Sequence, residues 1–113
     1  MKLLLCFGTR PEAIKMAPVI NVFKKDSVNF KTLVAVTAQH REMLDQVLSV
    51  FDIIPDYDLD LMSKSQTLEG LTGKILNGIS RLLIQIQPDL IFVQGDTTTT
   101  FSASLASFYK MIP

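Results

Sequence analysis

The sequence lacks the cysteine and histidine content that several common site types need. It has no tryptophan, one cysteine and one histidine among 113 residues. A lone cysteine, Cys6, cannot form an internal disulfide, and with a single histidine it cannot build a zinc site. The acidic stretch at residues 56–60 has leucine and threonine where a calcium loop requires glycine and glutamate. We therefore expect no bound metal, and we expect Cys6 to be a buried, inert thiol.

An excess of charge of one sign is also missing. Lysine plus arginine and aspartate plus glutamate number 11 each, so the net charge is 0. Nucleic-acid-binding and membrane-surface domains carry a basic patch or stripe. We therefore expect neither nucleic acid nor a membrane as a partner, and a phosphorylated ligand must be held by a few placed cations.

Long hydrophobic runs are absent as well. The first apolar run ends at Gly8, which is too short for a signal peptide, and no later run approaches the length of a membrane span. These absences favour a cytoplasmic protein.

The composition that remains is globular, with 48% apolar and 19% charged residues. A chain of 113 residues suffices for one packed core but not for two domains. It stops at Pro113, after a helical pattern that normally leads into another strand. We expect residues 1–113 to form one truncated domain of a protein whose C-terminal domain lies outside this chain.

Near-continuous apolar runs at residues 3–7, 33–38 and 90–93 predict parallel strands that form a buried sheet centre. Residues 56–61 alternate acidic and apolar side chains, which predicts a short edge strand. Helical patterns separate these runs. The first begins near Pro11 and contains Pro18, which predicts a kink near residues 14–17; the second follows His40; the third ends at Pro88. The fourth is marked by Phe101, Leu105 and Phe108.

This alternation predicts an α/β fold with a doubly wound, Rossmann-like parallel sheet in the strand order 3-2-1-4. Ligands of such sheets bind beyond the carboxyl ends of the strands, where the strand order reverses. The loops there are residues 8–12 and 94–100, and both lead into helix N-termini, which favour anions. Neither loop has the dinucleotide fingerprint or the P-loop pattern, so those two modes of nucleotide binding are unsupported.

A few polar side chains in or near these loops are candidates for ligand contact, each with a structural alternative. Arg10 can present a planar fork to phosphate and Lys15 a point charge, or both can be solvated surface cations. Asp96 can be the N-cap of the fourth helix or a carboxylate aimed at a ligand. His40, beside Gln39 after the second strand, is more typical of a capping or hydrogen-bonding residue than of a catalyst.

Several segments strongly resemble the bacterial non-hydrolysing UDP-N-acetylglucosamine 2-epimerases. They are GTRPEAIKMAP at residues 8–18, TAQHREMLDQVL at 37–48 and GDTTTT at 95–100, with PDYDL at 55–59 and ASFY at 106–109 fitting the same family. The resemblance covers essentially the whole chain in the same order. It implies the N-terminal half of a glycosyltransferase-B-type fold, in which a nucleotide sugar binds between two Rossmann-like domains.

The resemblance also implies an activity and site residues. The family interconverts UDP-N-acetylglucosamine and UDP-N-acetylmannosamine for cell-envelope polysaccharides, acts as a homodimer and needs no cofactor. It eliminates UDP and then adds it back. Asp96 matches a catalytic carboxylate, Arg10 and Lys15 match substrate-binding cations, and Gln39 and His40 match an allosteric substrate site.

The family's remaining catalytic groups follow the end of this chain, so we expect the fragment alone to be inactive. Three alternatives stay open. The chain can be a non-catalytic nucleotide-sugar-binding module or a domain of a hydrolysing UDP-N-acetylglucosamine 2-epimerase. A flavodoxin-like domain ranks last, because no aromatic pair near the loops is evident to hold a flavin.

Overall fold

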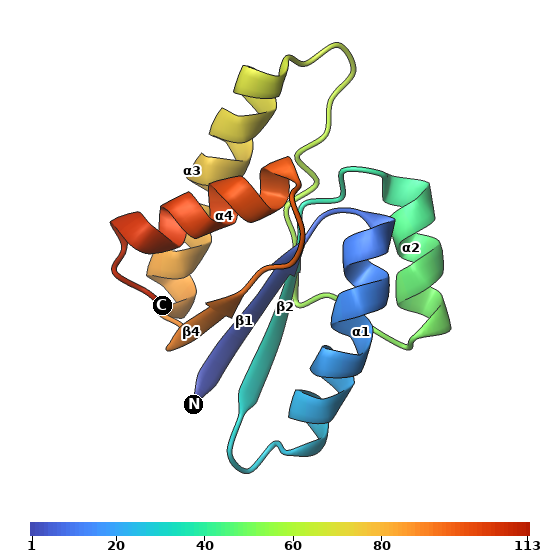
Figure 1. Ribbon diagram of the computed structural model, residues 1–113, viewed down its shortest axis with the longest axis vertical. Helices are drawn as coiled ribbons and strands as arrows, with labels where there is room; N and C mark the ends of the chain where they lie inside the picture. The colour runs from blue at the N-terminus through green and yellow to red at the C-terminus, as the bar shows by residue number, and fades with distance from the viewer.

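The computed structural model describes residues 1–113 and contains one sheet of four strands between two layers of helices (Figure 1). The strand order is β3-β2-β1-β4 and every strand pair is parallel. The doubly wound sheet, its order and the short edge strand are therefore confirmed. The elements, in chain order, are β1 (Lys2–Phe7), α1 (Arg10–Lys25), β2 (Lys31–Val36), α2 (Arg41–Val50), β3 (Tyr57–Asp58), α3 (Leu68–Ile86), β4 (Leu90–Phe92) and α4 (Thr98–Tyr109).

The central strand β1 contributes to a core on each face of the sheet. Leu3, Leu5 and Phe7 pack with α1 and α2, whereas Leu4 and Cys6 pack with α3 and α4. Figure 1 shows these helix pairs on opposite sides of the sheet. Successive side chains of a strand point to opposite faces, so a strand covered on both sides needs apolar residues at every position. This requirement is why the continuous apolar run predicted the fold correctly.

Two strands differ from their predicted placement. β2 ends at Val36 instead of residue 38, since Ala38 takes a left-handed φ of 59° that is incompatible with a strand. The prediction that β4 belongs to a buried sheet centre is wrong. β4 pairs only with β1 and lies at the edge of the sheet, so its residues are only half-buried.

The helix ends follow the sequence signals. The Thr67 hydroxyl accepts a hydrogen bond from the Gly70 amide at the start of α3, and α3 ends at a left-handed Gln87 just before Pro88. α1 continues through Pro18 without a break, and the kink predicted near residues 14–17 stays a prediction. None of the helices combines the length and apolar character that a membrane crossing requires.

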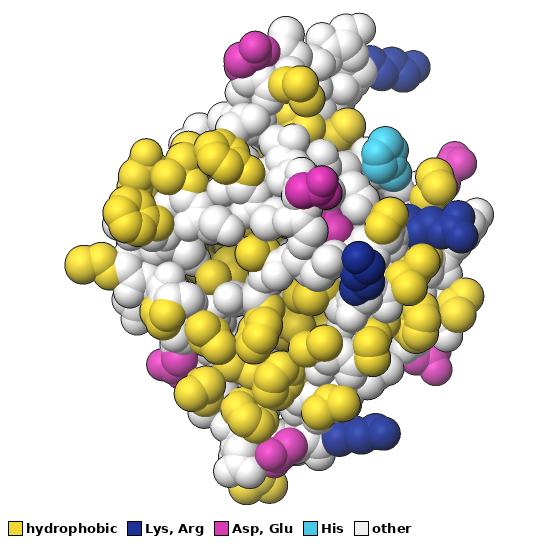
Figure 2. All heavy atoms as spheres, in the orientation of Figure 1, with side chains coloured by type: hydrophobic (Ala, Val, Ile, Leu, Met, Phe, Trp, Pro, Cys, Tyr) yellow, Lys and Arg dark blue, Asp and Glu magenta, His cyan; other side chains and the backbone are white.

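The fourth helix is present, but two of the three apolar residues that marked it point outward, while Leu105 is half-buried. Phe101 and Phe108 are 61% and 76% exposed. The buried face of α4 instead consists of small residues: Thr99, Ser102, Ala103, Ala106 and Ser107. Small side chains let α4 approach α3 and the sheet closely, which leaves no room for the aromatic rings. Figure 2 shows the resulting hydrophobic side chains gathered over α4 and around β4.

Candidate functional site

The candidate site lies at the carboxyl edge of the sheet, between the loops that follow β1 and β4. β1 has β2 on one side and β4 on the other, so the strand order reverses between these loops. The loop after β4 turns at Gly95, whose φ of 89° favours glycine. The predicted ligand-facing loops therefore lie next to each other in the fold.

An open groove of about 390 Å³ lies at this edge. Its lining residues come from the loop after β1, the start of α2 and the start of α4: Thr9, Arg10, Pro11, His40, Met43 and Thr97. Two predicted site residues that are far apart in sequence, Arg10 and His40, thus share one groove. The backbone N–H groups of Gly8 and Thr9 both donate to Glu12 and are therefore not available to an anion in this groove.

Asp96 is exposed and unpaired. Its carboxylate makes no hydrogen bond and no ion pair with any other residue. The N-cap of α4 is Thr97, whose Oγ1 accepts from the Thr100 amide at 3.2 Å. The alternative that Asp96 caps the helix is therefore wrong, and its carboxylate is free to meet a ligand.

Lys15 is less well placed than Arg10 to contact a ligand in the groove. It is exposed on α1, makes no hydrogen bond or ion pair, and does not line the groove that contains Arg10. The structure therefore does not bring the two predicted substrate-binding cations together within this chain.

Gln39 and His40 differ in how firmly they are held. The Gln39 backbone N donates to the Gly8 carbonyl at 2.9 Å, and its side-chain Oε1 accepts from Thr99 Oγ1 at 2.8 Å. His40 occupies the N-cap position of α2, yet its exposed side chain makes no capping hydrogen bond. His40 is thus the N-cap of α2 by position only, and its unpaired imidazole lines the groove.

Glu12 is the residue that the sequence analysis missed. It is only 2% exposed, although it is a carboxylate without a cationic partner. Its Oε2 accepts from the backbone N of Gly8 and Thr9, each at 2.8 Å, and from Thr9 Oγ1 at 2.9 Å. Its Oε1 accepts from Thr97 Oγ1. The Thr9-to-Glu12 spacing is that of a capping box, which signals the local contacts but not the one to Thr97.

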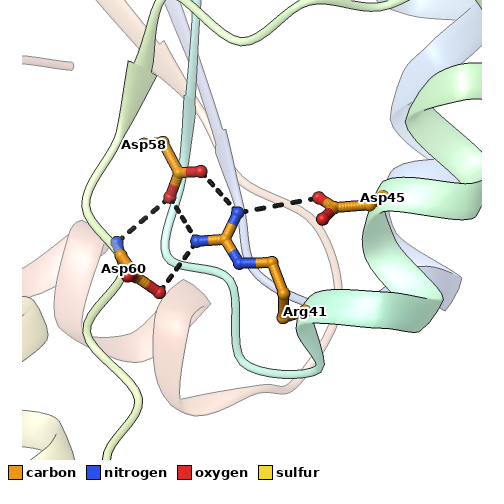
Figure 3. A network of polar contacts seen from close by, with 4 residues as sticks. All are labelled: Arg41, Asp45, Asp58 and Asp60. Carbon is orange, nitrogen blue, oxygen red and sulfur yellow. Dashed lines mark hydrogen bonds and ion pairs between the residues drawn. The ribbon is translucent and has the colours of Figure 1, made fainter.

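Arg41, next to His40, joins the end of β3 and the residues after it to the start of α2 (Figure 3). Its guanidinium forms paired hydrogen bonds with Asp58 and a further one of 2.8 Å with Asp60, while Asp45 lies 3.6 Å away. Hydrogen bonding to Arg41 holds the pKa of Asp58 below its ordinary value. These carboxylates are engaged by Arg41, and no cluster of three or more metal-binding side chains occurs in the chain.

Comparison with known proteins shows which family the chain is similar to. The profile of the family described as UDP-N-acetylglucosamine 2-epimerase matches residues 22–113. A UDP-N-acetylglucosamine 2-epimerase from Salmonella typhimurium is 56% identical over 113 residues, which is 100% of this chain and 30% of that protein. The chain therefore spans about a third of the length of such relatives.

Solved structures agree. The UDP-GlcNAc 2-epimerase of Neisseria meningitidis, bound to UDP-GlcNAc, superposes with a TM-score of 0.92 at 55% identity, covering 100% of this chain and 31% of that one. An enzyme of the same name from Methanocaldococcus jannaschii, in complex with UDP-GlcNAc and UDP, gives 0.91 at 33% identity, covering 99% of this chain and 31% of that one. The fold is retained in the Methanocaldococcus enzyme although about two thirds of the aligned residues differ.

Proposed function

The chain belongs to the UDP-N-acetylglucosamine 2-epimerase family, and from this premise we propose that it is the N-terminal domain of an enzyme that interconverts UDP-N-acetylglucosamine and UDP-N-acetylmannosamine. The whole protein would close the groove at the carboxyl edge of the sheet with a second Rossmann-like domain, in a glycosyltransferase-B arrangement. The relatives' greater length and the UDP-GlcNAc bound by the Neisseria enzyme support this proposal.

The observation that carries the proposal is the unpaired carboxylate of Asp96 at the reversal point of the sheet. Asp96 neither caps α4 nor pairs with a cation. A carboxylate that serves no structural contact, in the loop where ligands of such sheets bind, is suited to proton transfer with a bound sugar.

The reaction requires a carboxylate of this kind because the hydrogen on sugar C2 is not acidic. In the elimination, the bond between C1 and the diphosphate oxygen breaks, the C2 proton passes to a base, and a C1–C2 double bond forms. In the return step, UDP oxygen attacks C1 and a proton reaches C2 from the opposite face. Asp96 is proposed to take part in these proton transfers, together with groups from the rest of the protein.

The remaining candidates are proposed to bind, not to react. Arg10 lines the groove and offers a planar fork to the departing diphosphate, whose developing charge it would stabilise. Lys15 is assigned to the same role by its place in the family motif alone. Gln39 and His40 are proposed to contact a second, allosteric substrate molecule, which the unpaired His40 imidazole supports.

We also propose a cytoplasmic homodimer that supplies UDP-N-acetylmannosamine for cell-envelope polysaccharides. The outward aromatic face of α4 offers apolar area for association, with Phe101, Phe108 and Tyr109 all exposed. Sedimentation of the full-length protein tests this part, and a strictly monomeric profile at high concentration would contradict it.

The activity itself is tested by proton NMR of the full-length protein with UDP-N-acetylglucosamine in D2O. UDP-N-acetylmannosamine should appear and deuterium should replace the C2 hydrogen. Release of free N-acetylmannosamine and UDP would instead identify a hydrolysing enzyme. Binding without turnover would identify a non-catalytic module.

A further inference from the structure

Glu12 joins the two loops that the proposed reaction uses. One of its carboxylate oxygens bonds to the loop after β1, through Gly8 and Thr9, and the other bonds to Thr97, 85 positions along the chain. No other side chain bridges these loops in this way. We infer that Glu12 is a positioning residue that fixes the loop carrying Asp96 against the loop carrying Arg10; the inference rests on the proposed function.

The bond to Thr97 is the one that reaches the Asp96 loop. Thr100 Oγ1 lies 3.3 Å from Glu12 Oε1 but only 2.8 Å from the Gln94 carbonyl oxygen, so its single proton goes to Gln94. The Thr97 hydroxyl accepts from the Thr100 amide and donates its proton to Glu12. Thr97 therefore caps α4 and ties its first turn to Glu12, and Asp96 is the residue immediately before it.

A carboxylate fits this place because both of its oxygens receive hydrogen bonds. The backbone N–H groups of Gly8 and Thr9, which can only donate, face Oε2, and the Thr97 hydroxyl donates to Oε1. The buried charge has no cation beside it and is stabilised by these donors and by the N-terminal ends of α1 and α4. Such a group is costly to bury for packing alone, which favours a positioning role.

The substitution Glu12→Gln affects the contacts of the two carboxylate oxygens differently. The backbone donors of Gly8 and Thr9 cannot rotate, so the glutamine carbonyl oxygen stays on that side. Its NH2 group then faces Thr97, so the Thr97 hydroxyl can no longer donate to residue 12 and can only accept from it after turning its own proton away. Glu12→Gln therefore keeps the start of α1 and replaces the charge-assisted bond to the start of α4 with a weaker, reoriented one.

The test uses the full-length protein with Glu12→Gln and a matched control, Glu69→Gln. Glu69 is also in the first turn of a helix, α3, but it is exposed and makes no hydrogen bond. We measure kcat and KM for UDP-N-acetylglucosamine, the thermal midpoint, and hydrogen exchange of the amides of residues 98–101. For Glu12→Gln we expect kcat to fall by roughly 10- to 100-fold with KM within a few-fold, and faster exchange at 98–101. The control should match the wild type.

A second variant tests whether Glu12 acts through Thr97. Thr97→Val removes the same bond from the other side together with the cap on the Thr100 amide, so Thr97→Val should be the worse single variant and the double variant should lose about as much kcat as Thr97→Val alone. Additive losses, or a Glu12→Gln protein with unchanged kcat or unchanged exchange at 98–101, would overturn the inference. If the wild-type protein shows no epimerisation, the proposed function fails, and the exchange measurement still decides whether Glu12 holds the loop.

Discussion

Thr99 Oγ1 donates a 2.8 Å hydrogen bond to the side-chain Oε1 of Gln39, across 60 positions of sequence. Because Thr99 has one proton, the 2.8 Å contact between Thr99 and Thr37 must be donated by Thr37. The hydroxyls and the amide thus form one directed chain over the end of β1. This chain fixes the Gln39 oxygen toward α4 and leaves the Gln39 NH2 group free to donate elsewhere.

Thr99→Val should break this chain without changing the side-chain volume much. Thr37 would keep a buried hydroxyl without its acceptor, so we expect a loss of about 1–3 kcal/mol in the free energy of unfolding. Urea unfolding measures it. Thr98→Val is the matched control, because Thr98 makes no side-chain hydrogen bond, and it should change stability by less than about 0.5 kcal/mol. Equal losses in both variants would contradict the chain.

Gly8 lies directly beneath the same hydroxyls. A Cβ at this position would lie 2.1 Å from Thr37 Oγ1 and 2.6 Å from Thr99 Oγ1. Gly8→Ala should therefore destabilise the protein by about 1–3 kcal/mol through overpacking. Gly73→Ala, where nothing lies within 4 Å, should instead stabilise α3 by about 0.5–1 kcal/mol. Opposite signs in thermal unfolding are the expected result, and a stabilising Gly8→Ala would refute the close contact.

Cys6 should be inert in the folded protein and should make stability depend on alkaline pH. Burial, with a smaller contribution from the charge of Glu12, raises the pKa of Cys6 to about 12 from 9.0. The folded state therefore favours the protonated thiol. Its contribution to stability is complete below pH 9 and is lost as the pH rises toward about 12.

Urea unfolding at a series of alkaline pH values measures this effect, and Cys6→Ala should remove that part of the slope. A thiol reagent at neutral pH should label the unfolded protein only. Rapid labelling of the native protein would contradict the burial of Cys6.

The Arg41 contacts shown in Figure 3 should respond to acid. Hydrogen bonding to Arg41 lowers the pKa of Asp58 from 3.8, so the folded state favours its ionised form. This contribution is present at neutral pH and is lost as the pH falls through the lowered pKa. An NMR titration of Asp58 measures the shift directly. Arg41→Gln should move the pKa of Asp58 up, and an unchanged value would show that Arg41 is not its cause.

The fold was predictable because its signals are local. Continuous apolar runs indicated strands covered on both faces, and Pro88 marked the end of α3 correctly. The buried face of α4 was not predictable in the same way. Small residues pack inward there because α3 and the sheet are close. This closeness arises from the tertiary structure and cannot be inferred from the spacing of Phe101 and Phe108 in the sequence.

The site was predictable only in part. Its loops and the candidates Arg10 and His40 could be named from the strand order and the motifs, and the structure brings both residues into one groove. The sequence does not show whether Thr97 or Asp96 caps α4, because both residue types cap helices well and the backbone conformation at residues 96–100 decides between them. The contact between Glu12 and Thr97 depends on chain closure over 85 positions, for which the sequence has no local signal.

Turnover of UDP-N-acetylglucosamine by full-length Asp96→Asn tests the central proposal most directly. Since Thr97 caps α4 and the exposed Asp96 carboxylate makes no hydrogen bond or ion pair, unfolding stability should stay within about 0.5 kcal/mol of the wild type. We expect kcat to fall by at least about 100-fold, because the amide cannot exchange the C2 proton. A stably folded Asp96→Asn protein with kcat within a few-fold of the wild type would contradict the assignment of Asp96 to the chemistry.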